Sequence, residues 1–203
     1  AEEWTALFDR RSGWLGADGI FSVPLDGEDG VGDATASSRT MFVFSDTRVG
    51  TADPIDLTYD QTKFLNNSSA VLTGDRPDPR RARFVTPDGG AFGSHDWMND
   101  GIAIGDRVYV TGFAHDENWN PSRIDLFSLP IVRGEPDYAA VERTEDVGLL
   151  LRNDEHIVMF GVGIMDNSEV DGYVYVYGYR NTLLGGRKDL VVARVPEENF
   201  ADV

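Results

Sequence analysis

The sequence predicts an all-β fold. No stretch of the 203 residues shows sustained apolar periodicity of 3.6 residues, so long amphipathic helices are not expected. Short apolar runs, in which aromatic and β-branched residues alternate with other residues, are instead separated by turns of Gly and Asp, as in antiparallel sheets. The chain contains 22 glycines, which fits many tight turns better than it fits a helical bundle.

Three segments repeat the same order of three short strands. The expected strands are 18–25, 40–46 and 68–72, then 100–104, 107–112 and 124–129, and finally 160–165, 173–178 and 189–194. Repeats spaced by roughly 60–80 residues, loops included, are typical of the blades of a β-propeller. A sandwich of nine short strands is the alternative.

About three blades are present, whereas propellers usually need at least four to close. We therefore expect residues 1–203 to be the N-terminal part of a single β-propeller domain, whose remaining blades are missing or lie on another chain. The first strand of each segment has a Gly at or near its start, where we expect the backbones of neighbouring strands to approach closely. The arginines of the polar loop 76–93 are expected to pair with the acidic surface.

Composition excludes several classes of function. The formal net charge is -17, so the surface repels phosphate backbones and anionic lipids, and neither nucleic acid nor a membrane is an expected partner. No apolar run approaches the ~20 residues that cross a bilayer. The absence of cysteine excludes disulfides, zinc–thiolate sites and cysteine nucleophiles. We predict no metal site for catalysis.

The strongest candidate site is a pair of aspartates. Asp18 precedes the first strand of the first segment, and Asp46 follows the second strand. Because the two strands are expected to be antiparallel neighbours, these ends lie at the same edge of the sheet. Two carboxylates at one opening are what glycoside hydrolysis requires, one protonated as the acid and one ionised. The alternative is that both simply cap turns.

Asp100 is the third predicted catalytic residue, since it precedes Gly101 as Asp18 precedes Gly19. We expect substrate binding by side chains near these aspartates, because aromatic faces cover sugar rings while polar groups bind hydroxyls. The predicted substrate-binding residues are Trp14, Asn67, His95, Trp97 and His156, although Asn67 and His156 also fit a turn and a structural histidine. Trp4 and Trp119 are assigned to the core, and His115 to a surface loop.

Two runs carry a resemblance to a known family. Residues 13–25, GWLGADGIFSVPL, and residues 41–50, MFVFSDTRVG, resemble secreted bacterial five-bladed β-propellers, formerly uncharacterised domains that are related to endo-D-arabinanases. Residues 64–68, 97–101 and 190–196 are also similar to that group. The resemblance implies a five-bladed propeller of glycosidase type, with an acidic pair matching Asp18 and Asp46. The loop between these aspartates is longer here, and only about three of the five blades are present.

The resemblance implies a glycoside hydrolase acting on a furanoside-type or related polysaccharide, without an organic cofactor and with room for a structural calcium ion. Together with a sequence that begins at Ala1 without an initiator Met, it implies a secreted or periplasmic protein. A non-catalytic glycan-binding propeller of a secreted or surface assembly is the first alternative. A structural module whose open edges bind another chain is the second.

Overall fold

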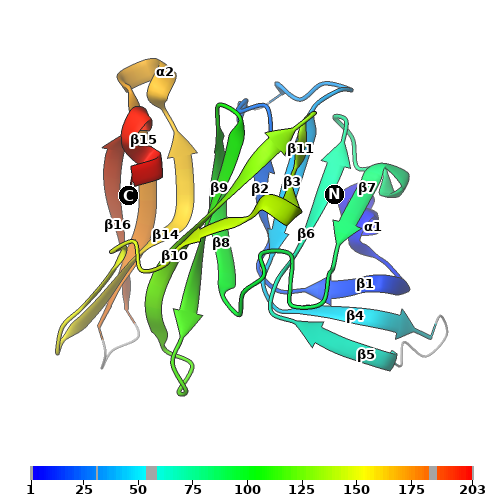
Figure 1. Ribbon diagram of the computed structural model, residues 1–203, viewed down its shortest axis with the longest axis horizontal. Coiled ribbons are helices and arrows are strands. Elements are labelled where there is room, and N and C mark those ends of the chain that lie inside the picture. Colours follow the sequence, from blue (N-terminus) through cyan, green and yellow to red (C-terminus); the bar gives the residue numbers. More distant parts are fainter. Residues whose placement is uncertain (1, 31, 54–58, 183–186, 203) are drawn as a thin grey trace.

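The computed structural model describes residues 2–30, 32–53, 59–182 and 187–202, and strands dominate these ranges (Figure 1). The prediction of an all-β fold is confirmed. Within the described ranges, helical structure is limited to short segments: α1 (Glu2–Phe8), α2 (Ser168–Asp171) and the 3₁₀ turns η1 (Pro79–Arg81), η2 (Tyr138–Ala140) and η3 (Glu197–Asp202). None of the helices in the described part of the chain is both long and apolar enough to cross a membrane.

Three antiparallel sheets follow one another along the chain. The first has the order β2 (Phe21–Pro24), β3 (Arg39–Phe44), β6 (Ser68–Thr73) and β7 (Ala82–Val85). The second is built on β8 (Trp97–Ile104), β9 (Arg107–His115) and β10 (Pro121–Val132), with β11 (Glu135–Pro136) and β12 (Glu142–Thr144) pairing with β10. The third has the order β13 (Leu150–Arg152), β14 (His156–Asp166), β15 (Tyr173–Thr182) and β16 (Lys188–Pro196).

These three sheets pack face against face in succession (Figure 1). Val23 and Met41 of the first sheet share a buried cluster with Val108 and Phe127 of the second. A separate cluster joins the second sheet to the third: Ile102, Leu126, Ile164, Val174, Val176 and Phe200. The nine predicted strands therefore form three sheets, each with the predicted membership, which disagrees with the alternative of a two-sheet sandwich.

A further small sheet and α1 were not expected from the sequence. This sheet has the order β1 (Ser12–Ala17), β4 (Thr47–Ala52) and β5 (Tyr59–Leu65). Leu7 of α1 and Trp14 of β1 are buried with Phe42 and Phe44 of β3, so this N-terminal part covers the outer face of the first sheet. The segment 76–93 is not the loop that was predicted, because it contains η1 and β7. Arg80 pairs with Asp78 and Arg83 with Glu135, which confirms the expected pairing with acidic residues for these two arginines.

Glycines allow close backbone approach where two strands bulge. The pairing of β8 with β9 shifts register between Met98 and Gly101. A Cβ atom on Gly101 would lie 2.5 Å from the carbonyl oxygen of Tyr109 and 3.2 Å from a methyl group of Val23 in the neighbouring sheet. The expected crowding around a first-strand glycine is confirmed here, because no side chain fits in that space.

Candidate functional site

Asp18 and Asp46 lie side by side at a bend in the chain. The pairing of β1 with β4 ends at Ala17 and Thr47, and that of β2 with β3 begins at Phe21 and Val43. Between these two pairings, the Asp18 amide donates a hydrogen bond to the carbonyl oxygen of Asp46 at 3.1 Å. The Ser45 amide donates one to the carbonyl oxygen of Asp18 at 3.0 Å. The structure therefore brings the two aspartates together where a paired ribbon passes from one sheet to the next.

Buried hydroxyl groups hold this bend in place. The Ser45 hydroxyl donates to the carbonyl oxygen of Met98 at 2.9 Å, which ties the bend to β8. The Thr47 hydroxyl donates to the carbonyl oxygen of Ser45 and lies 2.7 Å from the hydroxyl of Ser68. Because Ser45, Thr47 and Ser68 are all buried, their hydrogen bonds are shielded from water and keep the bend rigid.

The carboxylate pair lines an open pocket on the surface. Its lining consists of Leu15, Gly16, Ala17, Asp18, Asp46, Arg48 and Phe64. The Arg48 guanidinium lies 4.7 Å from the centroid of the Phe64 ring, and the Phe64 side chain is 65% exposed. Neither residue was a predicted site residue, because β5 was not expected from the sequence and its place beside Asp46 depends on the pairing of β4 with β5.

The two carboxyl groups do not have the same environment. Partial burial and repulsion by the Asp46 carboxylate raise the pKa of Asp18, although a backbone hydrogen bond from Asp46 opposes the shift. The Asp46 carboxylate accepts a hydrogen bond from the indole nitrogen of Trp97 at 3.0 Å. A proton is therefore retained more readily on Asp18 than on an ordinary aspartate, while Asp46 is fixed in orientation by a donor.

Trp97 links this pair to an aromatic cluster. Its ring lies 5.4 Å from Phe113, 5.1 Å from His115 and 5.8 Å from Trp119, measured between ring centroids. The side chains of Trp4 and Trp119 are 44% and 64% exposed, so the assignment of both to the core was wrong. His115 and Trp119 thus join the site region, and neither was predicted for it.

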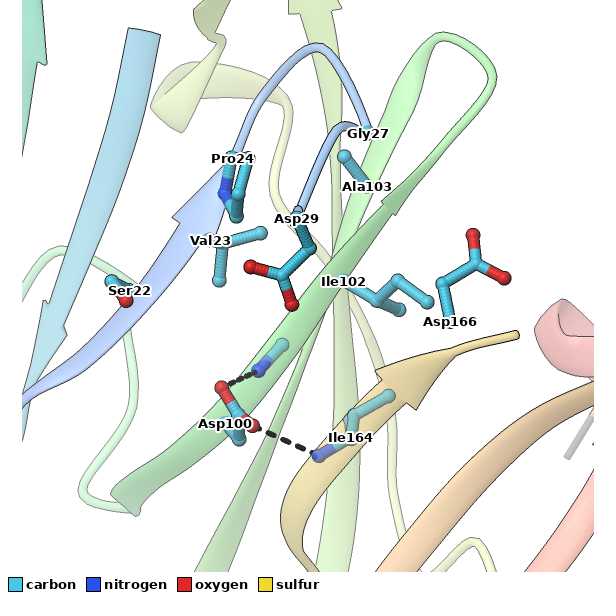
Figure 2. Close-up of a pocket in the computed structure, with 11 residues that line it drawn as sticks. Ser22, Val23, Pro24, Gly27, Asp29, Asp100, Ile102, Ala103, Ile164 and Asp166 are labelled. Atoms are coloured by element: carbon cyan, nitrogen blue, oxygen red, sulfur yellow. Dashed lines mark hydrogen bonds between the residues drawn. The ribbon is translucent and has the colours of Figure 1, made fainter. Parts of the chain in front are cut away.

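Asp100 does not join Asp18 and Asp46 in the predicted manner. It lies at the bulge of β8 and lines a separate, small cavity of about 40 Å³, which shares no residue with the pocket of the pair. Figure 2 shows that Asp29, from the loop after β2, and Asp100, from β8, point into this cavity. Among the described residues, no group of three or more His, Asp or Glu side chains is arranged to hold a metal ion, and the structural calcium ion stays a prediction.

The Asp100 carboxylate instead joins two sheets. It accepts the amide of its own neighbour Gly101 at 2.9 Å and that of Ile164 in β14 at 2.8 Å (Figure 2). The pKa of Asp100 is raised overall. Burial and the charge of Asp29 raise it, and the two hydrogen bonds from backbone amides oppose the shift. The extra residues of a β-bulge re-aim side chains, which is why an aspartate that corresponds to Asp18 in sequence points to a different place.

Two predicted substrate-binding residues are buried. Trp14 is 5% exposed, packs on Phe44 and Phe84, and donates its indole N–H to Ser68 at 3.1 Å. Asn67 is fully buried, and its side-chain amide forms hydrogen bonds with backbone groups of the segment before β8. Both predictions are corrected: neither side chain can reach a ligand from its place in the interior, and each stabilises the fold.

The two remaining predicted residues lie outside the pocket lining. His95 is exposed, and its ring nitrogen lies 3.1 Å from the side-chain oxygen of Asn66. His156 is the first residue of β14, and its ring nitrogen lies 3.8 Å from the Glu155 carboxylate. Of the predicted site residues, the structure thus brings together Asp18, Asp46 and Trp97.

Comparison with known proteins places the chain in a family. The family model described as a domain of unknown function, DUF5005, matches residues 1–203. The chain belongs to this family. No curated protein matches the DUF5005 chain at a significant level.

A solved structure has a similar fold. The crystal structure of a "putative hydrolase" from Bacteroides ovatus superposes with a TM-score of 0.67 at 18% sequence identity. The match covers 98% of the DUF5005 chain and 53% of the other chain, so the present chain spans about half the length of that protein. At this identity the likeness shows a shared all-β fold, and the function of the DUF5005 chain has to be argued from its own residues.

Proposed function

We propose that this protein is a hydrolase of glycosidic bonds, with Asp18 and Asp46 as its catalytic pair. The single observation that carries the proposal is the contrast between two neighbouring carboxyl groups at an open pocket. The pKa of Asp18 is raised by partial burial and by Asp46, whereas Asp46 is held by the Trp97 indole. Neighbouring acids in different environments are how glycosidases separate acid and base roles.

In the proposed reaction, protonated Asp18 donates its proton to the glycosidic oxygen as the bond to the sugar breaks. Asp46 either removes a proton from the attacking water or attacks the sugar carbon, after which water releases the product. Carboxyl groups about 5 Å apart imply retention of configuration, and those about 6.5–9.5 Å apart imply inversion. The substrate we propose is a furanoside-type or related polysaccharide, which follows from the sequence resemblance.

We also propose that the three large sheets are blades of a five-bladed propeller in a secreted or periplasmic protein. Residues of β2, β8 and β14, the strands nearest one another in the three sheets, line one small cavity, which supports a shared axis. The similar solved chain is about twice as long, which is compatible with further blades outside residues 1–203, on the same or a second chain.

The test is hydrolysis by the chain and by two variants, Asp18→Asn and Asp46→Asn. Reducing ends released from arabinan, arabinogalactan and inulin are measured, with Asp75→Asn as the control because Asp75 is exposed and lies outside the pocket. We expect each site variant to lose at least about a hundredfold in rate while its circular dichroism spectrum is unchanged. Full activity of Asp46→Asn, or no hydrolysis of any of the three polymers by the parent chain, would contradict the proposal.

Glycan binding without hydrolysis is a second candidate, and Arg48 favours it. This cation lines the same pocket as the two aspartates. An arginine beside carboxyl groups can bind sugar hydroxyls through hydrogen bonds without any proton transfer to the glycosidic oxygen. In that case the parent chain binds one of the three polymers and releases no reducing ends.

A further inference from the structure

The hairpin between β9 and β10 presents an exposed tryptophan beside the candidate site. Trp119 lies at its tip, between His115 and Pro121, and 64% of its side chain is exposed. Its φ is +65°, in the left-handed region that is unfavourable for a bulky residue. Such a conformation persists only where the surroundings hold it, and it is concentrated at functional sites.

Asp116 holds the tip of the hairpin in this conformation. Its carboxylate accepts the amides of Asn118 and Asn120 at 2.8 and 2.9 Å. The Trp119 amide donates to the carbonyl oxygen of Asp116 at 3.0 Å. The hydrogen bond from the Asn120 amide is the largest cause that lowers the pKa of Asp116, so the carboxylate is ionised at neutral pH. The indole is therefore pre-positioned, and little conformational entropy would be lost on binding a ligand.

The Trp119 ring stacks on the aromatic cluster that leads to Asp46. It lies nearly parallel to Trp97, with an interplanar angle of 21° and 5.8 Å between centroids, and 4.6 Å from His115. The Trp97 indole in turn donates its hydrogen bond to Asp46. Trp97 and His115 both pack against the Trp119 ring. Because 64% of Trp119 is still exposed, part of the ring is open to solvent, and Trp97 is the side chain that links it to Asp46.

We propose that Trp119, backed by Trp97, is a stacking platform for a second sugar ring of the substrate chain, adjacent to the ring that is cleaved. This inference rests on the proposed function. Apolar C–H faces of sugars pack on indole rings, while hydroxyl groups bind to neighbouring polar groups. The platform selects oligosaccharides and polysaccharides over single glycosides, because only a chain can occupy both the carboxylate pocket and the indole face.

The test compares the affinity of Trp119 variants for a polymer in a background that does not cleave it. Asp46→Asn provides this background, because the asparagine oxygen can still accept the Trp97 hydrogen bond. Binding of arabinan, arabinogalactan and inulin is followed by calorimetry in Asp46→Asn alone and with Trp119→Ala, Trp119→Phe or Trp4→Ala. Trp4 is the matched control, because it is an exposed tryptophan on α1.

We expect Trp119→Ala to weaken binding of the recognised polymer at least tenfold. Trp119→Phe should retain most of the affinity because it keeps an aromatic face, and Trp4→Ala should retain all of it. Binding of the corresponding monosaccharide should not change in Trp119→Ala. Equal affinities of Trp119→Ala and Trp4→Ala, or no polymer binding by any form, overturn the inference.

The experiments distinguish a failure of the proposed catalytic roles from a failure of the proposed stacking platform. If the chain with intact Asp46 releases no reducing ends but Trp119→Ala still loses affinity selectively, the platform stands and catalysis by Asp18 and Asp46 does not. If hydrolysis depends on Asp46 while Trp119→Ala binds and cleaves the polymer normally, catalysis stands and the platform does not.

Discussion

Asn67 shows how one buried amide can join two parts of the chain. Its side-chain nitrogen donates to the carbonyl oxygens of Ser94 and Asp96 at 3.0 and 3.2 Å, and its oxygen accepts the Phe92 amide at 3.0 Å. Every one of these backbone groups lies in the segment just before β8, which leads to Trp97. Asn67 therefore positions one flank of the candidate site without touching a ligand.

We predict that Asn67→Ala lowers the free energy of unfolding by about 3 kcal/mol, because it leaves buried backbone groups without partners. Asn66 is the matched control. It is partly exposed, and its contacts are with His95. Asn66→Ala should cost less than about 1 kcal/mol. Urea denaturation of both variants measures the difference, and similar losses would show that Asn67 has no special role.

Asp96 and Asp125 form a buried acidic pair near the same segment. Asp125 is fully buried and is bound by Arg123, Arg143 and the Asp146 amide, so its pKa is lowered despite its burial. Burial and the hydrogen bond with Asp125 raise the pKa of Asp96 to about 6, although Arg143 and Arg123 oppose the shift. The folded protein therefore binds a proton at Asp96 more tightly than the unfolded chain does.

Stability should depend on pH through this group. A raised pKa in the folded state contributes stability that is present below the unfolded value of 3.8 and is lost as pH rises through about 6. We predict that Asp96→Asn removes this loss, so that the variant gains stability relative to the parent between pH 4 and pH 7, by at most about 3 kcal/mol. Urea denaturation at several pH values tests this. A difference that does not change with pH would contradict it.

Residue types alone predicted that two of the candidate residues, Asp18 and Asp46, lie close together. Asp18 and Asp46 are near each other because antiparallel pairing brings the end of one strand to the start of its neighbour, which the sequence pattern indicates. Trp14 and Asn67 were misplaced because their burial depends on α1 and on the segment before β8, which come from elsewhere in the chain. Trp119 was missed because a tryptophan in isolation is more often buried, and nothing local reveals a positive φ.

At the scale of elements, alternation and Gly/Asp turns were sufficient to predict nine strands and their grouping into three sheets. Several of the strands that the sequence did not predict have weak patterns: β1 and β5 contain few alternating apolar residues, and β12 and β13 have three residues each. Such segments become strands because a partner strand supplies hydrogen bonds, and that partner is known only from the tertiary structure.

Bulges also depend on tertiary structure. The pairing of β14 with β15 shifts register between Phe160 and Gly163, as the pairing of β8 with β9 does beside Gly101. Opposite the bulge, Gly178 is so close to β14 that an added Cβ would lie 2.1 Å from the carbonyl oxygen of Met159. A real Cβ cannot occupy that place, so the strands would have to separate.

We predict that Gly178→Ala lowers the free energy of unfolding by about 3 kcal/mol or prevents folding, because the clash is with backbone atoms. Gly163→Ala is the control in the same sheet. A Cβ there would lie 3.5 Å from that of Tyr177, an ordinary contact, so we expect a change of less than about 1 kcal/mol. Thermal and urea denaturation give both values, and a mild effect of Gly178→Ala would mean that the bulge yields easily.

At the scale of the whole molecule, the two faces of the third sheet differ. Val174 and Val176 of β15 point toward the second sheet and are buried in the cluster with Ile102 and Leu126. The opposite face carries large exposed apolar side chains, among them Met165, Leu190 and Val192. Val192 pairs with Tyr177, and Val176 with Ala193, so the two valines lie on adjacent strands and on opposite faces.

Truncating each of these two valines measures how much each face of the sheet contributes to the free energy of unfolding. Val176 is 4% exposed and Val192 is 54% exposed, so the same truncation should have unequal effects. We predict that Val176→Ala lowers the free energy of unfolding by about 2 kcal/mol, from lost burial and a residual cavity. Val192→Ala should cost less than about 1 kcal/mol. Urea denaturation at two protein concentrations tests both values. If a second copy of the chain covers the outer face in solution, the loss in Val192→Ala approaches that of Val176→Ala and grows with protein concentration, which would contradict the exposure of this face in residues 1–203.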